Sequence, residues 1–288
     1  MKITITDSAE HAQTAQASLD ISRKRAKELG RIALGWIRRK AYVGPSGEWI
    51  NISAALDAAV AAKVSIPPGA GLPSPPERAS LVMEVEFANI STLIAAKRLV
   101  AEGERPLVLN FANGVCPGGG FLSGSRAQEE VLCRSSGLYL TLEGDPMYAA
   151  HALRPLPDST EWSILSPAVP VFRRDHGPTE TKPWVMDVLT CAAPVATRMD
   201  ATEAAEMLGC RISRVLAIAD AYGYTSLILG AWGCGAFGNN TELCARDFHR
   251  ELTGPFAGRF GRVVFAITDW SEPREKLAIF ARAFGGEC

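Results

Sequence analysis

NFANGVCPGGGFLSGSRAQEEVLCRSSGLY, residues 110–139, is the stretch that decides the fold. It overlaps the end of the apolar run PLVLNFA at 106–112 and contains three consecutive glycines, Gly118–Gly120, followed after seven residues by QEE at 128–130. This order predicts a buried strand, a glycine-rich loop and a helix with two carboxylates in its first turn. Because neighbouring residues of a helix point roughly 100° apart, one of the two glutamates is expected to face the glycine loop.

Apolar runs alternate with helical patterns from residue 79 onward, which predicts an α/β fold with helices on both faces of a sheet. Near-continuous apolar runs such as SLILGAW are typical of strands buried on both sides. The expected strands are 81–87, 106–112, 163–172, 184–193, 226–232 and 262–268, and the expected helices are 91–102, 127–140, 202–222, 241–252 and 273–283. The polar stretch 173–183 is expected to be a loop.

The first 78 residues are predicted to form a mainly helical accessory segment, with helices at 20–40 and 54–63 and a short strand at 48–53. The Pro- and Gly-rich stretch 65–77 is typical of a linker, so the chain is divided into residues 1–78 and a main α/β domain at 79–288. The basic residues of helix 20–40 either contact a polyanion or form the solvated face of an amphipathic helix, and the solvated face is favoured.

Composition excludes several classes of protein. The chain has 288 residues and a formal net charge of −1, which argues against general nucleic-acid binding, so a polyanion must be bound by a local site. The sequence contains no run of about 18 apolar residues, the length that would predict a membrane span. The seven cysteines are scattered and never spaced as CxxC, which favours reduced thiols of a cytoplasmic protein over disulfides or a zinc site. We expect neither a metal nor a cofactor.

Two glycine-rich segments follow apolar runs: CPGGG at 116–120 and GCGAFGNN at 233–240. Ligands of open α/β sheets bind at the carboxyl ends of strands, and glycines there let backbone amides approach an anion. A helix that begins near Asn240 adds a favourable potential for phosphate. Neither segment matches a Walker A or Rossmann motif, and each alone is equally compatible with a tight turn. Together they favour a diphosphate ligand.

The glutamates at 129 and 130 suggest acid chemistry. A carboxyl group held beside a sugar can protonate a leaving oxygen, as in glycosidases. The alternative is that they only complement the helix dipole, which is common for acids in a first turn. No second carboxylate stands at an obvious spacing, and Asp187 or Asp269 would reach the site only through the fold. Cys133 and Cys234 are expected to pack rather than act as nucleophiles.

The pattern GGG, seven residues, then QEE resembles the catalytic signature of poly(ADP-ribose) glycohydrolases, and the surrounding stretch is similar to their bacterial-type branch. SPAVPVFRRD, DVLTCAAP and GAWGCGAFGNN occur in the order typical of that branch. The resemblance extends roughly from Lys24 to Ala283 and implies a macrodomain, a three-layer α/β/α fold with a mixed sheet. It also implies hydrolysis of the ribose–ribose O-glycosidic bonds of poly(ADP-ribose), with ADP-ribose as the product.

The resemblance assigns roles to matching positions. Glu130 is expected to be the general acid/base, which protonates the glycosidic oxygen and then activates water, while Glu129 and Asn113 hold ribose hydroxyls. Phe237 is expected to pack on the ribose near the scissile bond. The family pattern favours Asn at the position of Val195, on the adenine side. The expected substrate-binding residues are Asn113, Gly118, Gly119, Gly120, Gln128, Gly233, Cys234, Gly235, Ala236, Phe237, Gly238 and Thr268.

Two other functions fit the same pocket. The chain could hydrolyse single ADP-ribose marks on protein or nucleic acid, or it could bind ADP-ribose without cleaving it. The pair Glu129–Glu130 argues against simple binding, because a reader of ADP-ribose has no need of a general acid. The expected partners are therefore poly(ADP-ribose) or other ADP-ribosylated macromolecules as substrate, and ADP-ribose as product.

Overall fold

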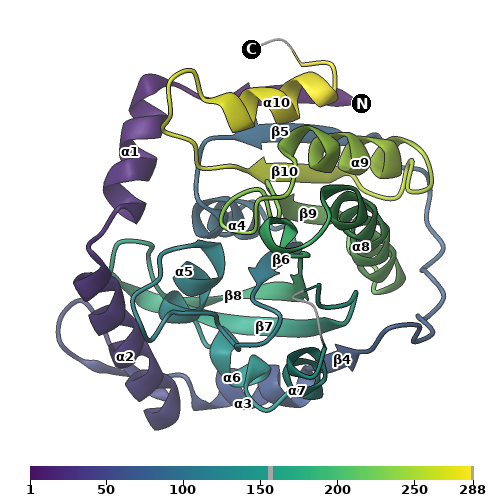
Figure 1. Ribbon diagram of the computed structural model, residues 1–288. Helices are drawn as coiled ribbons and strands as arrows, with labels where there is room; N and C mark the ends of the chain where they lie inside the picture. Colours follow the sequence, from purple (N-terminus) through teal and green to yellow (C-terminus); the bar gives the residue numbers. More distant parts are fainter. Residues whose placement is uncertain (155–157, 287–288) are drawn as a thin grey trace.

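The structure is a computed structural model that describes residues 1–154 and 158–286 (Figure 1). Its centre is an eight-stranded sheet in the order β1-β5-β10-β9-β6-β8-β7-β4. In this sheet order, the first six strands, β1 through β8, pair in parallel. The pairs β8–β7 and β7–β4 are antiparallel, so the sheet is mixed as expected. The strands are β1 Lys2–Thr6, β4 Val64–Ile66, β5 Glu84–Ala88, β6 Pro106–Ala112, β7 Ser163–Arg173, β8 Thr179–Ala192, β9 Ser226–Leu229 and β10 Arg262–Ala266, and β2 Ala41–Val43 pairs with β3 Trp49–Asn51 in a separate hairpin.

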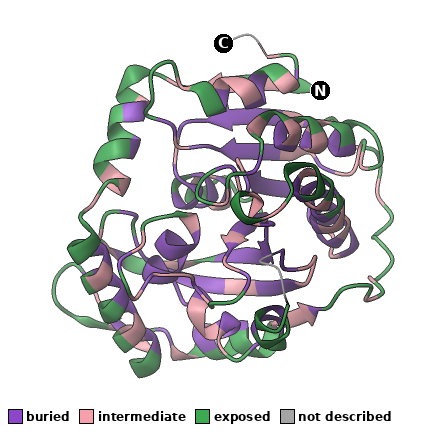
Figure 2. Cartoon of the chain, viewed as in Figure 1, coloured by how far each residue is buried: buried purple, intermediate pink, exposed green. Residues whose placement is uncertain are grey.

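Helices cover both faces of this sheet, which confirms the three-layer α/β/α arrangement. Successive residues of one strand point to opposite faces: Leu227 and Leu229 enter one hydrophobic cluster and Ile228 enters another. The first cluster includes residues of α8, α9 and α10, and the second includes residues of α4, α5, α6 and α7. Figure 2 shows that the central strands are largely buried, whereas the surrounding helices also carry exposed residues. The helices are α1 Ala9–Leu19, α2 Arg23–Arg39, α3 Ser53–Ala62, α4 Thr92–Ala101, α5 Gln128–Ser135, α6 Leu138–Leu142, α7 Pro146–Ala152, α8 Ala201–Ala221, α9 Thr241–Thr253 and α10 Glu275–Ala283.

The first 78 residues are mainly helical, as expected, but they also supply both edge strands of the central sheet. β1 pairs with β5 at one edge, and β4 pairs with β7 at the other. Sequence analysis missed both strands, and it placed a linker over part of β4. The division of the chain at residue 78 stays a prediction.

Two other expectations about secondary structure were wrong. The helix expected at 127–140 is interrupted, because Ser136 is extended and forms a β-bridge with Val171, and the Gly137 amide donates to the Pro170 carbonyl at 2.8 Å. The loop expected at 173–183 exists but is shorter, at 174–178, because β8 begins at Thr179 and continues the antiparallel ladder with β7. Within the described ranges, no helix is long and apolar enough to cross a membrane.

Candidate active site

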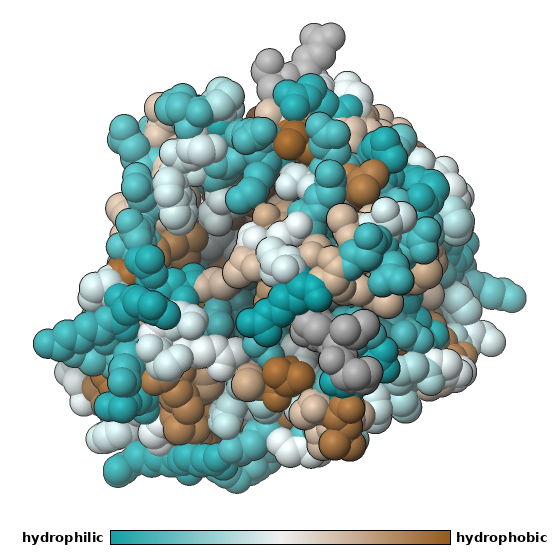
Figure 3. All heavy atoms as spheres, in the orientation of Figure 1, coloured by the Kyte–Doolittle hydropathy of each residue, from teal (hydrophilic) through white to brown (hydrophobic). Residues whose placement is uncertain are grey.

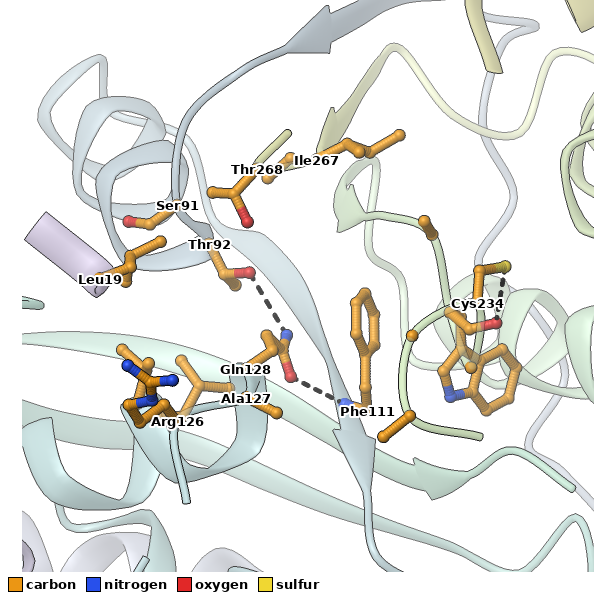
Figure 4. Close-up of a pocket in the computed structure, with 18 of the residues that line it drawn as sticks. Leu19, Ser91, Thr92, Phe111, Arg126, Ala127, Gln128, Cys234, Ile267 and Thr268 are labelled. Atoms are coloured by element: carbon orange, nitrogen blue, oxygen red, sulfur yellow. Dashed lines mark hydrogen bonds between the residues drawn. The ribbon is translucent and has the colours of Figure 1, made fainter. Parts of the chain in front are cut away.

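A cavity of about 430 Å³ opens at the carboxyl ends of the parallel strands (Figure 4). Its walls come from the segments that follow β5, β6, β9 and β10 and from the junction between α1 and α2. Of the expected site residues, seven line it: Gln128, Gly233, Cys234, Gly235, Ala236, Phe237 and Thr268. Asn113, Gly118, Gly119, Gly120, Glu129, Glu130 and Gly238 are not among its lining residues.

Gln128 fixes the start of the catalytic helix α5 to the neighbouring strand β6. Its side-chain amide donates to the Leu109 carbonyl at 2.8 Å and to Thr92 Oγ1 at 3.3 Å, and its Oε1 accepts from the Phe111 amide at 2.9 Å (Figure 4). Three hydrogen bonds to two other elements leave this side chain little freedom. Gln128 therefore positions the two glutamates that follow it, in addition to lining the cavity.

Glu129 is buried beneath the loop that follows β6. Its Oε2 accepts a hydrogen bond from the Asn113 amide at 2.7 Å, and its Oε1 accepts from Asn110 Nδ2 at 3.4 Å. Burial raises the pKa of Glu129 to about 8, the nearby charge of Glu130 adds to the increase, and the hydrogen bond from Asn113 opposes it. This carboxyl is therefore predominantly neutral at neutral pH.

Glu130 faces the glycine loop, as the helical geometry predicted for one of the two. Its Oε1 accepts a hydrogen bond from the Gly120 amide at 2.9 Å. Its Oε2 is buried and has no hydrogen-bond partner among the described residues. A buried polar atom without a partner is costly, and a catalytic role is one of the explanations for it. Glu130 thus has one oxygen held by the loop and one oxygen available for chemistry.

The glycines of 118–120 are required by the backbone and by the carboxylates beside it. Gly118 and Gly119 have φ of +69° and +56°, in the left-handed region that favours glycine. A Cβ on Gly119 would lie within 3.0 Å of Glu130 Oε1 and at 3.0 Å from Glu129 Oε2. Any other residue at 119 would therefore displace the carboxyl of Glu130.

Asn113 contacts Glu129 through its backbone amide, and its side chain is partly engaged elsewhere. Its Oδ1 accepts from the amides of Val115 and Cys116, both at 2.9 Å, in a turn that starts the catalytic loop. Only its side-chain amide group is left to meet a ribose hydroxyl, and the role expected for Asn113 stays a prediction.

The loop 233–238 presents backbone amides to the cavity. Gly233 and Gly238 have φ of +74° and +71°, and the Gly238 amide donates to the Gly235 carbonyl at 3.0 Å. The amides of Gly235, Ala236 and Phe237 have no acceptor within the part of the chain that the structure describes. A Cβ on Gly235 would meet nothing within 4 Å. This arrangement of open amides suits an anion such as a phosphate.

The aromatic and cysteine side chains near this loop differ in how far they reach the cavity. Trp232 is fully buried in the core. Phe237 lines the cavity and also packs against the core. Cys133 is fully buried, which raises its pKa and makes it a poor nucleophile. Cys234 is buried, with its Sγ against the Trp232 carbonyl at 3.5 Å.

Neither candidate second carboxylate reaches Glu130. Asp187 is held by Arg105, by the Tyr224 hydroxyl and by the Ala168 amide. Asp269 accepts hydrogen bonds from Ser271 and from the Lys276 amide, at the start of α10. Both have structural partners, so Glu129 is the carboxyl group next to Glu130. In the described ranges, no three His, Cys, Asp or Glu side chains gather in a group suited to a metal ion.

Sequence analysis missed several residues of the cavity. Arg126 lines it and donates a hydrogen bond to Asp20 at 2.6 Å. Arg134, on α5 behind the cavity, is fully buried. The missed lining residues lie at or near the ends of helices and strands, and only the strand order of the sheet shows that these ends meet. They are Asp20, Ser91, Thr92, Asp175, Trp270 and Lys276.

A pair of buried carboxyl groups and a glycine-rich loop with open amides, on a three-layer α/β/α fold, is the arrangement expected of a macrodomain-type glycosidase. Comparison with known families identifies which one. The model of the microbial-type poly(ADP-ribose) glycohydrolase catalytic domain matches residues 32–174, and the chain belongs to this family.

Solved structures agree with this assignment. The poly(ADP-ribose) glycohydrolase of Thermomonospora curvata is 38% identical to this chain and has a TM-score of 0.82. The match covers 90% of this chain and 99% of the Thermomonospora curvata chain. Its complex with the inhibitor ADP-HPD is 37% identical, with the same coverage and a TM-score of 0.80. The Deinococcus radiodurans enzyme in complex with ADP-ribose is 33% identical and has a TM-score of 0.73. The match covers 79% of this chain and 96% of the Deinococcus radiodurans chain. No curated protein matches the chain.

Proposed function

We propose that this protein is a poly(ADP-ribose) glycohydrolase that hydrolyses ribose–ribose O-glycosidic bonds and releases ADP-ribose, with Glu130 as the general acid/base. The observation on which the proposal rests is the state of the Glu130 carboxyl: one oxygen accepts from the Gly120 amide, and the other is buried without a partner. Related enzymes solved with ADP-ribose and with ADP-HPD support a nucleotide ligand in the adjoining cavity.

The reaction follows from the positions of these groups. Protonated Glu130 donates its proton to the glycosidic oxygen, and the bond between that oxygen and the ribose carbon breaks. The ribose carbon becomes positively charged, and the Glu130 carboxylate then takes a proton from the water that attacks it. This step yields a new hydroxyl on the ribose and restores the acid.

Glu129 and the loop 233–238 support this step without exchanging protons with the substrate. A neutral Glu129 adds no second negative charge beside Glu130 and can hydrogen-bond a ribose hydroxyl. The open amides of Gly235, Ala236 and Phe237 would accept the diphosphate and so hold the reacting ribose in place. Phe237 would cover the ribose from the cavity wall, which Thr268 also lines.

The same geometry would serve a hydrolase of single ADP-ribose marks or a reader, so the test compares substrates. The wild type and Glu130→Gln are incubated with poly(ADP-ribose) and with mono-ADP-ribosylated protein, and released ADP-ribose is measured. Polymer shortening that disappears in Glu130→Gln is the expected result. Release from the mono-modified protein alone would favour the second function, and binding without release from either substrate would favour a reader.

We also propose that the protein acts in the cytoplasm, with residues 79–288 as the catalytic domain and 1–78 as an accessory segment. The six cysteines of the described residues are free thiols, as expected in a reducing compartment. The accessory role is supported by β1 and β4, which cover the two edges of the sheet. Cell fractionation tests the location, and a chain that begins at residue 79 should lose solubility if the segment protects the sheet edges.

A further inference from the structure

We propose that a row of basic residues on α2, Arg23, Lys27 and Arg31, binds phosphates of the polymer that continues past the scissile bond. This inference rests on the proposed function, because it assigns a surface to the leaving part of the same substrate. It gives a role to basic residues that the sequence alone assigned to a solvated face.

Helix α2 is far more basic than the rest of the chain. It holds seven basic residues and one acidic residue, whereas the whole chain has a formal net charge of −1. The helix is buried along a single stripe that includes Ala26, Leu29 and Ala33. Most of its remaining surface is exposed or half-buried, and Figure 3 shows hydrophilic side chains over this part of the molecule, at the lower left. The basic side chains are therefore presented to solvent.

The three residues of the row lie on one side of the helix. Residues four apart on a helix are neighbours on its surface, so Arg23, Lys27 and Arg31 follow one another along the axis over about 12 Å at 1.5 Å per residue. Arg23 and Arg31 are exposed, and Lys27 is half-buried beside the catalytic loop. A regular line of cations of this kind suits the repeated phosphates of an extended polyanion.

These cations are not used by the protein itself. Arg25 pairs with Glu28, Arg38 pairs with Glu143, and Arg39 lies over the ring of Trp49 at 4.2 Å. Within the described ranges, by contrast, Arg23, Lys27 and Arg31 have no carboxylate within 4.0 Å. Apart from Lys24, which is also exposed without a carboxylate partner among the described residues, the basic residues of α2 outside the row are therefore engaged within the protein.

The unpaired row borders the catalytic loop. Gly124 lies so close to α2 that a Cβ there would fall within 3.0 Å of the Arg23 carbonyl oxygen and at 3.3 Å from Lys27 Cβ. The loop residue Gly120, four positions earlier, donates its amide to Glu130. One short loop thus joins the catalytic carboxyl to the row. Under the proposed function Glu130 protonates the oxygen of the leaving part of the polymer, so this part would leave next to this loop.

The experiment compares two triple variants with the same change in charge. The row variant is Arg23→Gln, Lys27→Gln, Arg31→Gln, and the control is Lys182→Gln, Arg246→Gln, Arg282→Gln, three exposed cations elsewhere without a carboxylate partner among the described residues. For each, kcat/KM on long poly(ADP-ribose) is measured over a range of salt concentrations, and ADP-ribose affinity is measured by calorimetry.

The row variant should lose about tenfold in kcat/KM at low salt while its ADP-ribose affinity stays unchanged. The slope of log kcat/KM against log salt should become less negative by about 2, because each ion pair with a single-stranded polyanion contributes roughly 0.7. The control should keep the wild-type slope. Equal slopes for the two variants would overturn the inference while leaving the proposed function intact.

Two further results are informative. Single-stranded DNA is added as a competing polyanion. If it inhibits the wild type but not the row variant, the surface binds polyanions in general and the assignment to the leaving polymer is wrong. If the wild type does not shorten the polymer, the proposed function fails, and filter binding of polymer to the two variants then tests the row directly: equal binding would refute it.

Discussion

Replacing Gly119 by alanine should damage catalysis without removing any catalytic group. The residue has φ of +56°, and its new Cβ would lie within 3.0 Å of Glu130 Oε1, whereas ordinary contacts begin at 3.4 Å. The carboxyl must therefore shift by several tenths of an ångström or more. Misplacing a reacting group by about 1 Å can cost on the order of a hundredfold in rate. We expect kcat on poly(ADP-ribose) to fall by about tenfold to a hundredfold.

A matched control separates this displacement from backbone strain. A left-handed conformation costs an alanine about 1–2 kcal/mol wherever it occurs. Gly69 has φ of +69° and would meet no atom within 4 Å, so Gly69→Ala should lose similar stability but retain its kcat. Thermal unfolding and the rate of ADP-ribose release are measured for both variants. Gly119→Ala with a kcat within threefold of wild type, or an equal loss in Gly69→Ala, would refute the reasoning.

Three other variants test separate parts of the site. Glu130→Ala should abolish turnover but keep ADP-ribose affinity within about tenfold, roughly 1.4 kcal/mol, and an active variant would contradict the role of this residue. Gly235→Val should fold normally, because its Cβ meets nothing within 4 Å, yet weaken ADP-ribose binding sharply by filling the approach to the open amides; unchanged affinity by calorimetry would count against the loop. Glu129→Gln should alter the pH dependence of stability. The pKa of Glu129 rises from 4.5 to about 8 on folding, so between these values the folded state holds a proton that the unfolded chain has lost, and the wild type loses stability as pH rises. The wild-type stability minus that of Glu129→Gln, from urea denaturation, should therefore fall by about 2–3 kcal/mol between about pH 5.5 and 7.5, and a constant difference would show that the carboxyl is not held neutral.

The sequence predicted well those features that depend on local patterns. The strand 106–112 was placed at its observed bounds, because an apolar run there begins at a proline and ends at the turn of Asn113. That one of the two glutamates faces the glycine loop followed from helix geometry, whereas the choice of Glu130 came from the resemblance. The roles of these residues came from the signature of glycines and glutamates, which occupies a single short stretch.

Features that depend on distant partners were not predictable from these patterns. The break after α5 exists because Ser136 forms a β-bridge with Val171, which lies 35 residues later in the chain. Arg134 resembles any charged helix residue in the sequence, yet tertiary packing buries it completely. The edge strands β1 and β4 are short, and only their pairing with β5 and β7 makes them strands. Cavity residues such as Thr92 and Trp270 come together only through the strand order of the sheet.

The most direct measurement is a crystal structure of Glu130→Gln with ADP-ribose bound. We predict that the side chain of residue 130 lies within hydrogen-bonding distance of one ribose hydroxyl. This is the hydroxyl on the ribose carbon that carried the scissile bond. The diphosphate oxygens should accept from the amides of Gly235, Ala236 and Phe237. A side chain at 130 turned toward bulk water, or a diphosphate bound away from these amides, would contradict the account.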